Sequence, residues 1–153
     1  MADAHILKAI VRTESDFRPL AIGVNTKGLI LTQPETRKQA ISTATALLDQ
    51  GHNIDLGLAQ INAKNLKKLG LTVEEAFDPC KNLNAAARLL QNDFNRARQS
   101  GLTTDRALIA GISAYNTGSF TRGIRNGYVK KVIFSLEQTE TPASAKNRST
   151  HRR

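Results

Sequence analysis

The carboxylate best placed for acid–base chemistry in this sequence is Glu14. At helical spacing it continues an apolar stripe formed by Leu7, Ile10 and Val11. On such a face, near a helix C-terminus, burial and the negative end of the helix dipole both raise the pKa of a carboxyl, which can then act as a general acid. The alternative, which position alone favours, is that the helix has left the core and Glu14 pairs with Arg12 or Arg18 at the surface.

Three further segments place polar side chains among apolar ones. They are Asp55–Asn62, Ala114–Gly118 and Gly127–Val132. Taken singly, each has an ordinary structural explanation: a buried strand-like run, a helix C-terminus and a core stripe. Their order along the chain, after Glu14, makes them informative.

Together these motifs resemble those of the lytic transglycosylases of the soluble, goose-lysozyme-like class. The resemblance covers about residues 4–133 and rests on Glu14-Ser15 followed by Phe17, Pro19 and Ala21, on Gly57-Leu-Ala-Gln-Ile61, on Ala114-Tyr-Asn-Thr-Gly118 and on Tyr128-Val129. Within this class, the chain is most similar to the transglycosylases that accompany type IV secretion and conjugation machines. That narrower resemblance rests on Ala21-Ile-Gly-Val-Asn25, Leu29–Pro34, Asp55–Asn62 and Ala76–Leu83. The family's usual Met in the Gly-Leu-Met-Gln-Ile motif is Ala59 here, a smaller side chain that would widen the floor of a groove.

The resemblance implies cleavage of the β-1,4 bond between N-acetylmuramic acid and N-acetylglucosamine in peptidoglycan, without a metal or other cofactor. The muramoyl C6 hydroxyl attacks C1 in place of water and leaves a 1,6-anhydro end. By this resemblance Glu14 protonates the leaving oxygen and then takes the proton of the C6 hydroxyl. The substrate's own N-acetyl group stabilises the intermediate, so the second carboxylate of most glycosidases is not needed.

The resemblance also implies a set of substrate-contacting residues: Ser15, Gln60, Asn62, Tyr115, Asn116 and Phe120. The serine and the glutamine match family positions that contact substrate, and the tyrosine matches one that hydrogen-bonds the catalytic carboxyl. The two asparagines also fit helix-capping roles, and the phenylalanine also fits the core. The three histidines show no metal-ligand spacing, so we expect no metal site.

Asp55 is the rival second carboxylate. It lies just before the Gly57 motif, and a retaining hydrolase would need two carboxyl groups about 5–5.5 Å apart. Capping or pairing is the other role open to this side chain. A lysozyme-type hydrolase therefore remains an alternative to the transglycosylase.

The elements that must position these residues are mostly helical. Apolar spacing and capping signals predict helices near residues 4–15, 34–50, 62–70, 72–76, 83–100, 104–116 and 128–136. Ala21–Gln33 holds two β-prone runs around a turn at Asn25–Gly28, which predicts a small hairpin after the first helix. The expected fold is mainly α, a single α-rich domain that is lysozyme-like by resemblance.

Charge and composition distinguish a globular domain from a basic C-terminal tail. The 153 residues carry a net charge of +9, and 40% of them are hydrophobic, which is typical of one globular domain. We predict the domain over residues 1–137 and a basic, disordered tail over 138–153. A basic body suits nucleic acid, an anionic lipid surface or an acidic cell-wall polymer. No helix-turn-helix, finger or aromatic ribonucleoprotein signature is present, so we expect no nucleic-acid partner.

Compartment and partners follow from the resemblance. No apolar run is long enough for a membrane span, and Met1–His5 lacks the features of a signal peptide. Because peptidoglycan in Gram-negative cells lies in the periplasm, we place the protein there, with a signal removed from this chain. The expected partners are peptidoglycan glycan strands and proteins of the secretion or conjugation machinery. A non-catalytic scaffold that binds the wall is the other alternative, and the presence of Glu14, Gln60 and Tyr115 argues against it.

Overall fold

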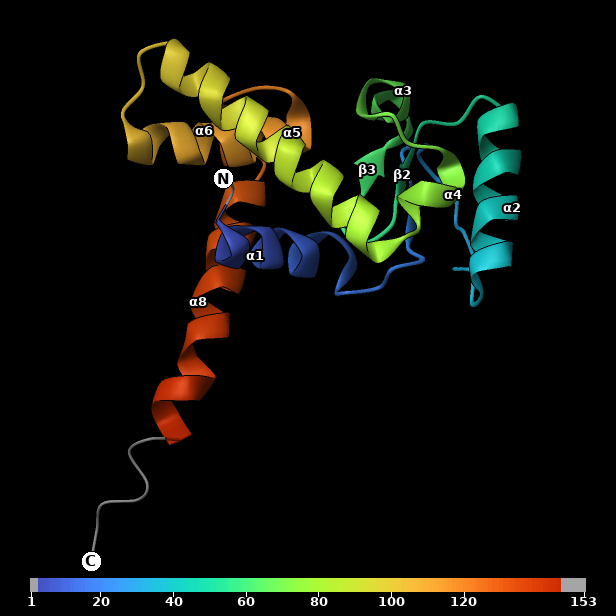
Figure 1. Ribbon diagram of the computed structural model, residues 1–153, viewed down its shortest axis with the longest axis horizontal. Coiled ribbons are helices and arrows are strands. Elements are labelled where there is room, and N and C mark those ends of the chain that lie inside the picture. The colour runs from blue at the N-terminus through green and yellow to red at the C-terminus, as the bar shows by residue number, and fades with distance from the viewer. Residues whose placement is uncertain (1–2, 147–153) are drawn as a thin grey trace, which may run out of the picture. The chain divides into compact units, whose positions relative to one another are not determined.

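The computed structural model in Figure 1 describes residues 3–146, with side chains to residue 138. Within this range the chain forms eight α-helices, one 3₁₀ helix and a three-stranded antiparallel sheet, which confirms the prediction of a mainly α fold. It comprises two compact units, one made of Met1–Thr13 with Leu89–Arg153 and the other of Glu14–Arg88.

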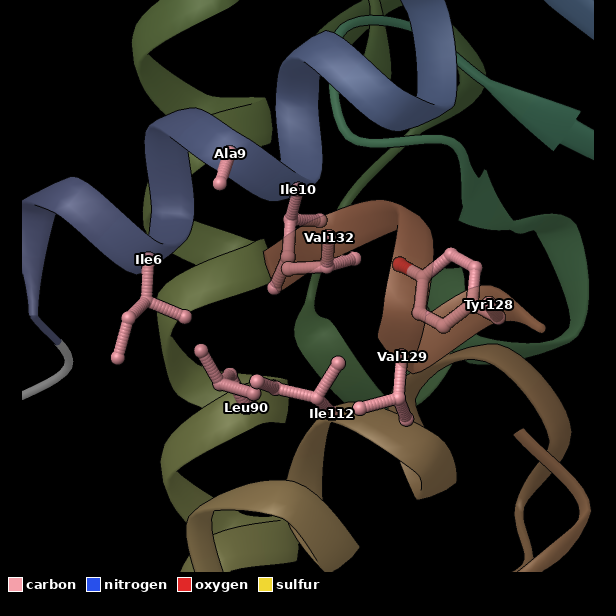
Figure 2. Close-up of a cluster of buried hydrophobic side chains, with 8 residues drawn as sticks. All are labelled: Ile6, Ala9, Ile10, Leu90, Ile112, Tyr128, Val129 and Val132. Atoms are coloured by element: carbon pink, nitrogen blue, oxygen red, sulfur yellow. The ribbon is translucent and has the colours of Figure 1, made fainter. Parts of the chain in front are cut away.

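In the residues that the structure describes, the regular elements of the first unit are all helices. Its elements are α1 (Ala4–Ser15) as far as Thr13, α5 (Pro79–Gln99) from Leu89 onward, α6 (Thr104–Thr117), α7 (Arg122–Arg125) and α8 (Tyr128–Lys146). Figure 2 shows side chains from four of these helices pointing toward one another: Ile6, Ala9, Ile10, Leu90, Ile112, Tyr128, Val129 and Val132. Burying one large aliphatic side chain contributes about 1.5–3 kcal/mol, so this cluster anchors α1. Of the predicted apolar stripe Leu7, Ile10 and Val11, the cluster includes Ile10.

The second unit holds the sheet and the short helices. Its elements are β1 (Ile22–Val24), α2 (Arg37–Asp49), β2 (Ile54–Leu56), β3 (Ile61–Asn62), the 3₁₀ helix η1 (Ala63–Asn65), α3 (Leu66–Leu69), α4 (Val73–Ala76) and the N-terminal part of α5. The strands lie in the order β1-β2-β3, with Ile22 opposite Leu56 and Asp55 opposite Asn62.

Two predicted helix starts in this unit are confirmed by their caps. The Asn62 side chain accepts a hydrogen bond from the Lys64 backbone N–H over 3.1 Å at the start of η1. Thr72 and Glu75 form a reciprocal capping box at the start of α4. Such caps satisfy N–H groups that a helix leaves without partners in its first turn.

The hairpin predicted within Ala21–Gln33 is wrong in its pairing. Only β1 forms there, and it pairs with the distant β2, whose Ile54 and Leu56 are fully buried. The side chains of the second β-prone run are not buried in this way, and Ile30 in that run is 95% exposed.

The side chain of Gln33 occupies the place of the missing strand. Its Nε2 donates to the Ile22 carbonyl and its Oε1 accepts from the Ile22 N–H, both over 2.9 Å. One side-chain amide therefore reproduces the donor and acceptor of a paired residue on the outer side of β1.

The boundaries of three helices differ from the sequence prediction. α5 begins at Pro79 instead of near residue 83. α2 begins at Arg37 instead of Pro34, because Thr36 and Gln39 form a capping box three residues later. α8 extends to Lys146, so its backbone runs through the first part of the segment 138–153 that composition predicted to be disordered. Residues 147–153, the rest of that predicted tail, lie outside the described residues.

Candidate active site

The end of α1 is joined to the turn that follows β2. Glu14, in the last turn of α1, is half-buried, and its neighbour Ser15 is only 4% exposed. The Ser15 hydroxyl donates a hydrogen bond to the Leu58 carbonyl over 2.6 Å. This bond holds the predicted acid–base residue next to the Gly57–Gln60 turn.

The turn itself is closed by the Gln60 side chain. Gln60 Nε2 donates to the carbonyls of Gly57 and Ala21, each over 3.0 Å. The Gln60 backbone N–H also donates to the Gly57 carbonyl. The predicted contact residue Gln60 therefore links the turn to the segment that leads into β1.

The side chain of Asn82, a residue of α5, holds the same turn through hydrogen bonds. Its Nδ2 donates to the carbonyls of Leu56 and Ala76 over 2.9 and 2.7 Å, and its Oδ1 accepts from the Ala59 N–H over 2.9 Å. The side chain is fully buried and makes three hydrogen bonds. The sequence analysis gave Asn82 no role, because nothing local to an asparagine in a helix shows that it is buried.

Gly57 is required by this packing. Its φ is +77°, and a Cβ there would collide with the Asn82 side chain and lie 2.6 Å from the Ala76 carbonyl oxygen. Only glycine combines that backbone conformation with so close an approach.

Backbone strain lies directly after α1 and in the Gly57–Gln60 turn. Within residues 3–146, the non-glycine residues with positive φ are Asp16, Phe17 and Gln60, at +53°, +63° and +52°. The first two end α1 directly after Ser15, and the third closes the turn. Such conformations cost of order 1–3 kcal/mol each and persist where surrounding contacts enforce them, often at functional sites.

Asp55, the rival carboxylate, lies on β2 within a group of asparagines. Its two oxygens accept hydrogen bonds from Asn25 Nδ2 over 3.1 Å and from Asn62 Nδ2 over 2.9 Å. Both asparagines also donate to Asn53 Oδ1. This geometry favours the pairing role that the sequence left open for Asp55, and it engages both ends of the Asn62 amide.

Three predicted contact residues belong to the first unit. Tyr115 is half-buried and packs against the cluster of Figure 2, in which its own side chain is not drawn. Asn116 is exposed, and its Oδ1 accepts a hydrogen bond from Asn126 Nδ2 over 3.0 Å.

Phe120, the third of these residues, packs against a small alanine cluster formed by Ala97, Ala107 and Ala110. The Arg96 guanidinium lies over its ring, 5.3 Å from the centroid. These contacts favour the core role that the sequence left open for Phe120.

At the end of α1, the second unit thus holds the Glu14 carboxyl group at a fixed point of the backbone. Its immediate surroundings are a buried serine, a turn held by two side-chain amides, and two strained residues. A carboxyl held in this way can donate a proton to a leaving oxygen and accept one from an attacking hydroxyl.

In the part of the chain that the structure describes, no helix has the length and apolar character needed to cross a membrane.

Comparison with known proteins gives a family match and several relatives. Residues 1–136 match the family model described as the Transglycosylase SLT domain. The chain is 41% identical to the type IV secretion system protein virB1 of Brucella abortus biovar 1 (strain 9-941) over 143 residues, covering 89% of this chain and 59% of that protein. It is 42% identical to protein virB1 of Agrobacterium fabrum (strain C58 / ATCC 33970) over 143 residues, covering 92% of this chain and 56% of that protein.

A third relative, protein virB1 of Rhizobium radiobacter, is 45% identical over 129 residues, covering 82% of this chain and 52% of that protein. The chain therefore spans less than two thirds of the length of these relatives. No solved structure matches it.

Proposed function

This chain belongs to the transglycosylase SLT domain family, and from that premise we propose that it is a peptidoglycan lytic transglycosylase that opens the cell wall for a type IV secretion or conjugation apparatus. The observation that carries the proposal is the position of Glu14. It lies in the last turn of α1 and is held through Ser15 to the Gly57–Gln60 turn, so two motifs of the family meet at a carboxyl group that can donate and accept a proton.

The proposed reaction uses Glu14 twice. Its carboxyl group protonates the glycosidic oxygen as the bond from that oxygen to C1 of the muramoyl sugar breaks. The resulting carboxylate then takes the proton of the C6 hydroxyl as that oxygen bonds to C1. Glu14 returns to its starting form, no water is consumed, and the product carries a 1,6-anhydro ring.

Two residues of the second unit have the best support as substrate contacts. Ser15 directly follows Glu14, and Gln60 belongs to the turn that Ser15 binds, although the bonds described above occupy part of their hydrogen-bonding capacity. For Asn62 and Phe120 we propose a supporting role, because one is engaged with η1 and Asp55 and the other packs in a core cluster. The substrate contacts of Tyr115 and Asn116 stay predictions.

Partners and compartment belong to the same proposal. The Brucella abortus relative, named as a type IV secretion system protein, supports an association with such a machine. The transglycosylase family supports peptidoglycan strands as the substrate, and we propose the periplasm as the site of action. We assign the catalytic function to residues 1–137 and treat 138–153 as a separate basic segment.

The experiment is mass spectrometry of the fragments released from purified sacculi. The chain is compared with its Glu14→Gln variant and with Glu35→Gln, a matched change at an exposed glutamate of the same unit. We expect wild type and Glu35→Gln to release fragments that are lighter than hydrolysed ends by one water, and Glu14→Gln to release none.

Two other outcomes would replace the proposal. Hydrated ends that depend on Glu14 would indicate a lysozyme-type hydrolase and return Asp55 to consideration as the second carboxylate. No release by the wild type, where a known transglycosylase works, would favour a non-catalytic scaffold.

A further inference from the structure

α8 carries a groove that the proposed reaction does not use. The groove lies within the first unit, has a volume of about 560 Å³ and is lined by Thr13, Gly127, Lys130, Lys131, Phe134 and Ser135. A cavity of this size is large enough to receive one or two large side chains of a ligand. We call it the α8 groove.

The two faces of α8 differ in character. Val129 and Val132 are buried in the cluster of Figure 2, whereas Phe134 is 61% exposed. Lys130 and Lys131 are exposed as well. An aromatic ring left in water beside a concave surface is a typical feature of an interaction site.

The hydroxyl groups in the groove are already engaged with the protein. Thr13 Oγ1 donates to the Ala9 carbonyl over 2.8 Å and lies 3.2 Å from Ser135 Oγ. Because a hydroxyl carries a single hydrogen, Ser135 must be the donor in that second bond. The groups that the groove offers to a ligand are therefore mainly the Phe134 ring and the two lysine ammonium groups.

The stretch of chain that supplies most of the lining residues is basic. Residues 106–136 contain five Lys and Arg residues and no Asp or Glu: the basic ones are Arg106, Arg122, Arg125, Lys130 and Lys131. All five are exposed. The acidic residues nearest to the groove along the chain are Glu14, which follows the lining residue Thr13, and Glu137, two residues beyond the lining residue Ser135. Such a stretch attracts an anionic ligand, and the net charge of +9 disfavours a second copy of the same chain.

We propose that the α8 groove docks an acidic segment of a partner protein. One apolar side chain of that segment packs on the Phe134 ring, and flanking carboxylates pair with Lys130 and Lys131. A concave site with one exposed ring fits the side chain of a peptide better than it fits the flat surface of a membrane. This proposal is independent of the glycan reaction, because none of its residues acts in that reaction.

The test is selection from a random-peptide library displayed on phage, with the full chain as bait and its Phe134→Ser variant for counter-selection. The enriched peptides are expected to be acidic and to share one large apolar residue. Synthetic copies should shift the backbone amide resonances of Lys130, Lys131 and Phe134 in ¹⁵N-labelled protein. Their affinity should fall by about tenfold or more in Phe134→Ser and in the double variant Lys130→Gln/Lys131→Gln.

Matched controls lie in the other unit. Lys67→Gln/Lys68→Gln alters a neighbouring pair of exposed lysines on α3, and Ile30→Ser alters an exposed apolar side chain. Both should keep the wild-type affinity, and circular dichroism should show the same helix content in every variant.

Three results would overturn the proposal. The first is enrichment of only neutral or basic peptides, or of none beyond those that the counter-selection bait also retains. The second is Phe134-dependent binding to phosphatidylglycerol vesicles without binding of acidic peptides, which would make the groove a membrane contact. The third is a Phe134-dependent dimer in sedimentation, which would make it a contact between copies of the chain.

Discussion

The Ser15 hydroxyl and the Leu58 carbonyl are joined by a 2.6 Å hydrogen bond that ties the end of α1 to the turn after β2. Because Glu14 directly precedes Ser15, the position of the proposed catalytic carboxyl depends on that turn. Gln60 and Asn82 hold the turn in place, so the acid–base residue rests on contacts from three separate parts of the sequence.

Ser15→Ala should lower activity more than stability. Loss of one hydrogen bond costs about 1 kcal/mol of unfolding free energy. A small shift of the reacting group reduces turnover far more, by up to about 100-fold. Urea unfolding and the rate of glycan release measure the two effects. Ser42→Ala, at an exposed position in α2, should change neither, and equal loss of activity in both variants would contradict the argument.

Asn82→Ala should destabilise the protein strongly. It leaves the Ala59 N–H and the carbonyls of Leu56 and Ala76 without their buried partner, and each such group costs about 1–3 kcal/mol. Urea unfolding should show a loss of at least about 2 kcal/mol. The control is Asn84→Ala, two residues along α5 and exposed, which should stay within about 0.5 kcal/mol of wild type.

Gly57→Ala and Gly28→Ala separate backbone conformation from close packing. Both glycines have positive φ, +77° and +82°, so alanine at either position costs about 1–2 kcal/mol. At Gly57 the new methyl group also collides with Asn82 and Ala76, whereas no atom lies within 4 Å of that point at Gly28. Thermal unfolding should therefore show a clearly larger loss for Gly57→Ala, and equal losses would refute the close approach.

Asp55→Asn tests the hydrolase alternative directly. The change removes a negative charge and places an amide nitrogen against a donor from Asn25 or Asn62, so we expect a stability loss of about 1–2 kcal/mol. Glycan release should stay within a few-fold of wild type at a temperature where both proteins are folded. Loss of release by a folded variant would instead assign Asp55 to the chemistry.

Lys81→Met should remove a pH-dependent part of the stability. The Lys81 ammonium lies 2.7 Å from the Glu75 carboxylate and holds the pKa of Glu75 below its ordinary value. A lowered folded-state pKa stabilises the protein above the pKa of the unfolded chain, about 4.3, and this effect disappears as the pH falls through the folded-state pKa. The difference in unfolding midpoint between wild type and Lys81→Met should therefore shrink below about pH 4.

The matched control for this pair is Lys68→Met, an exposed lysine on α3. The difference between this variant and wild type should not change over the same acid range. A difference for Lys81→Met that persists well below the folded-state pKa of Glu75 would show that the ion pair is not its source.

Local signals predicted most of the helical framework. The Thr72–Glu75 capping box, the Asn62 cap and the Gly118 stop of α6 each act within a few residues, so the sequence displays them directly. The sheet could not be predicted in this way. Ile22 pairs with Leu56 across more than thirty positions, and a hairpin is the only strand pairing that a local turn signal can indicate.

The candidate site, like the fold, could be predicted only where local spacing or resemblance indicates it. Helical spacing drew attention to Glu14, and resemblance joined it to the Gly57 motif. The bond between Ser15 and Leu58 and the burial of Asn82 depend on tertiary packing, which no spacing rule reveals. The capping box that sets the start of α2 at Arg37 was a local signal that the sequence analysis overlooked.

The Gln33 amide has a consequence for how the protein behaves in a crowded compartment. β1 is an outer strand of its sheet, and the unpaired amide and carbonyl of such a strand can template the addition of a foreign chain. By covering the N–H and C=O of Ile22, Gln33 occupies one of the positions on this edge at which such growth could start. A single side-chain amide thereby shields part of the open edge of the sheet from pairing with a foreign chain.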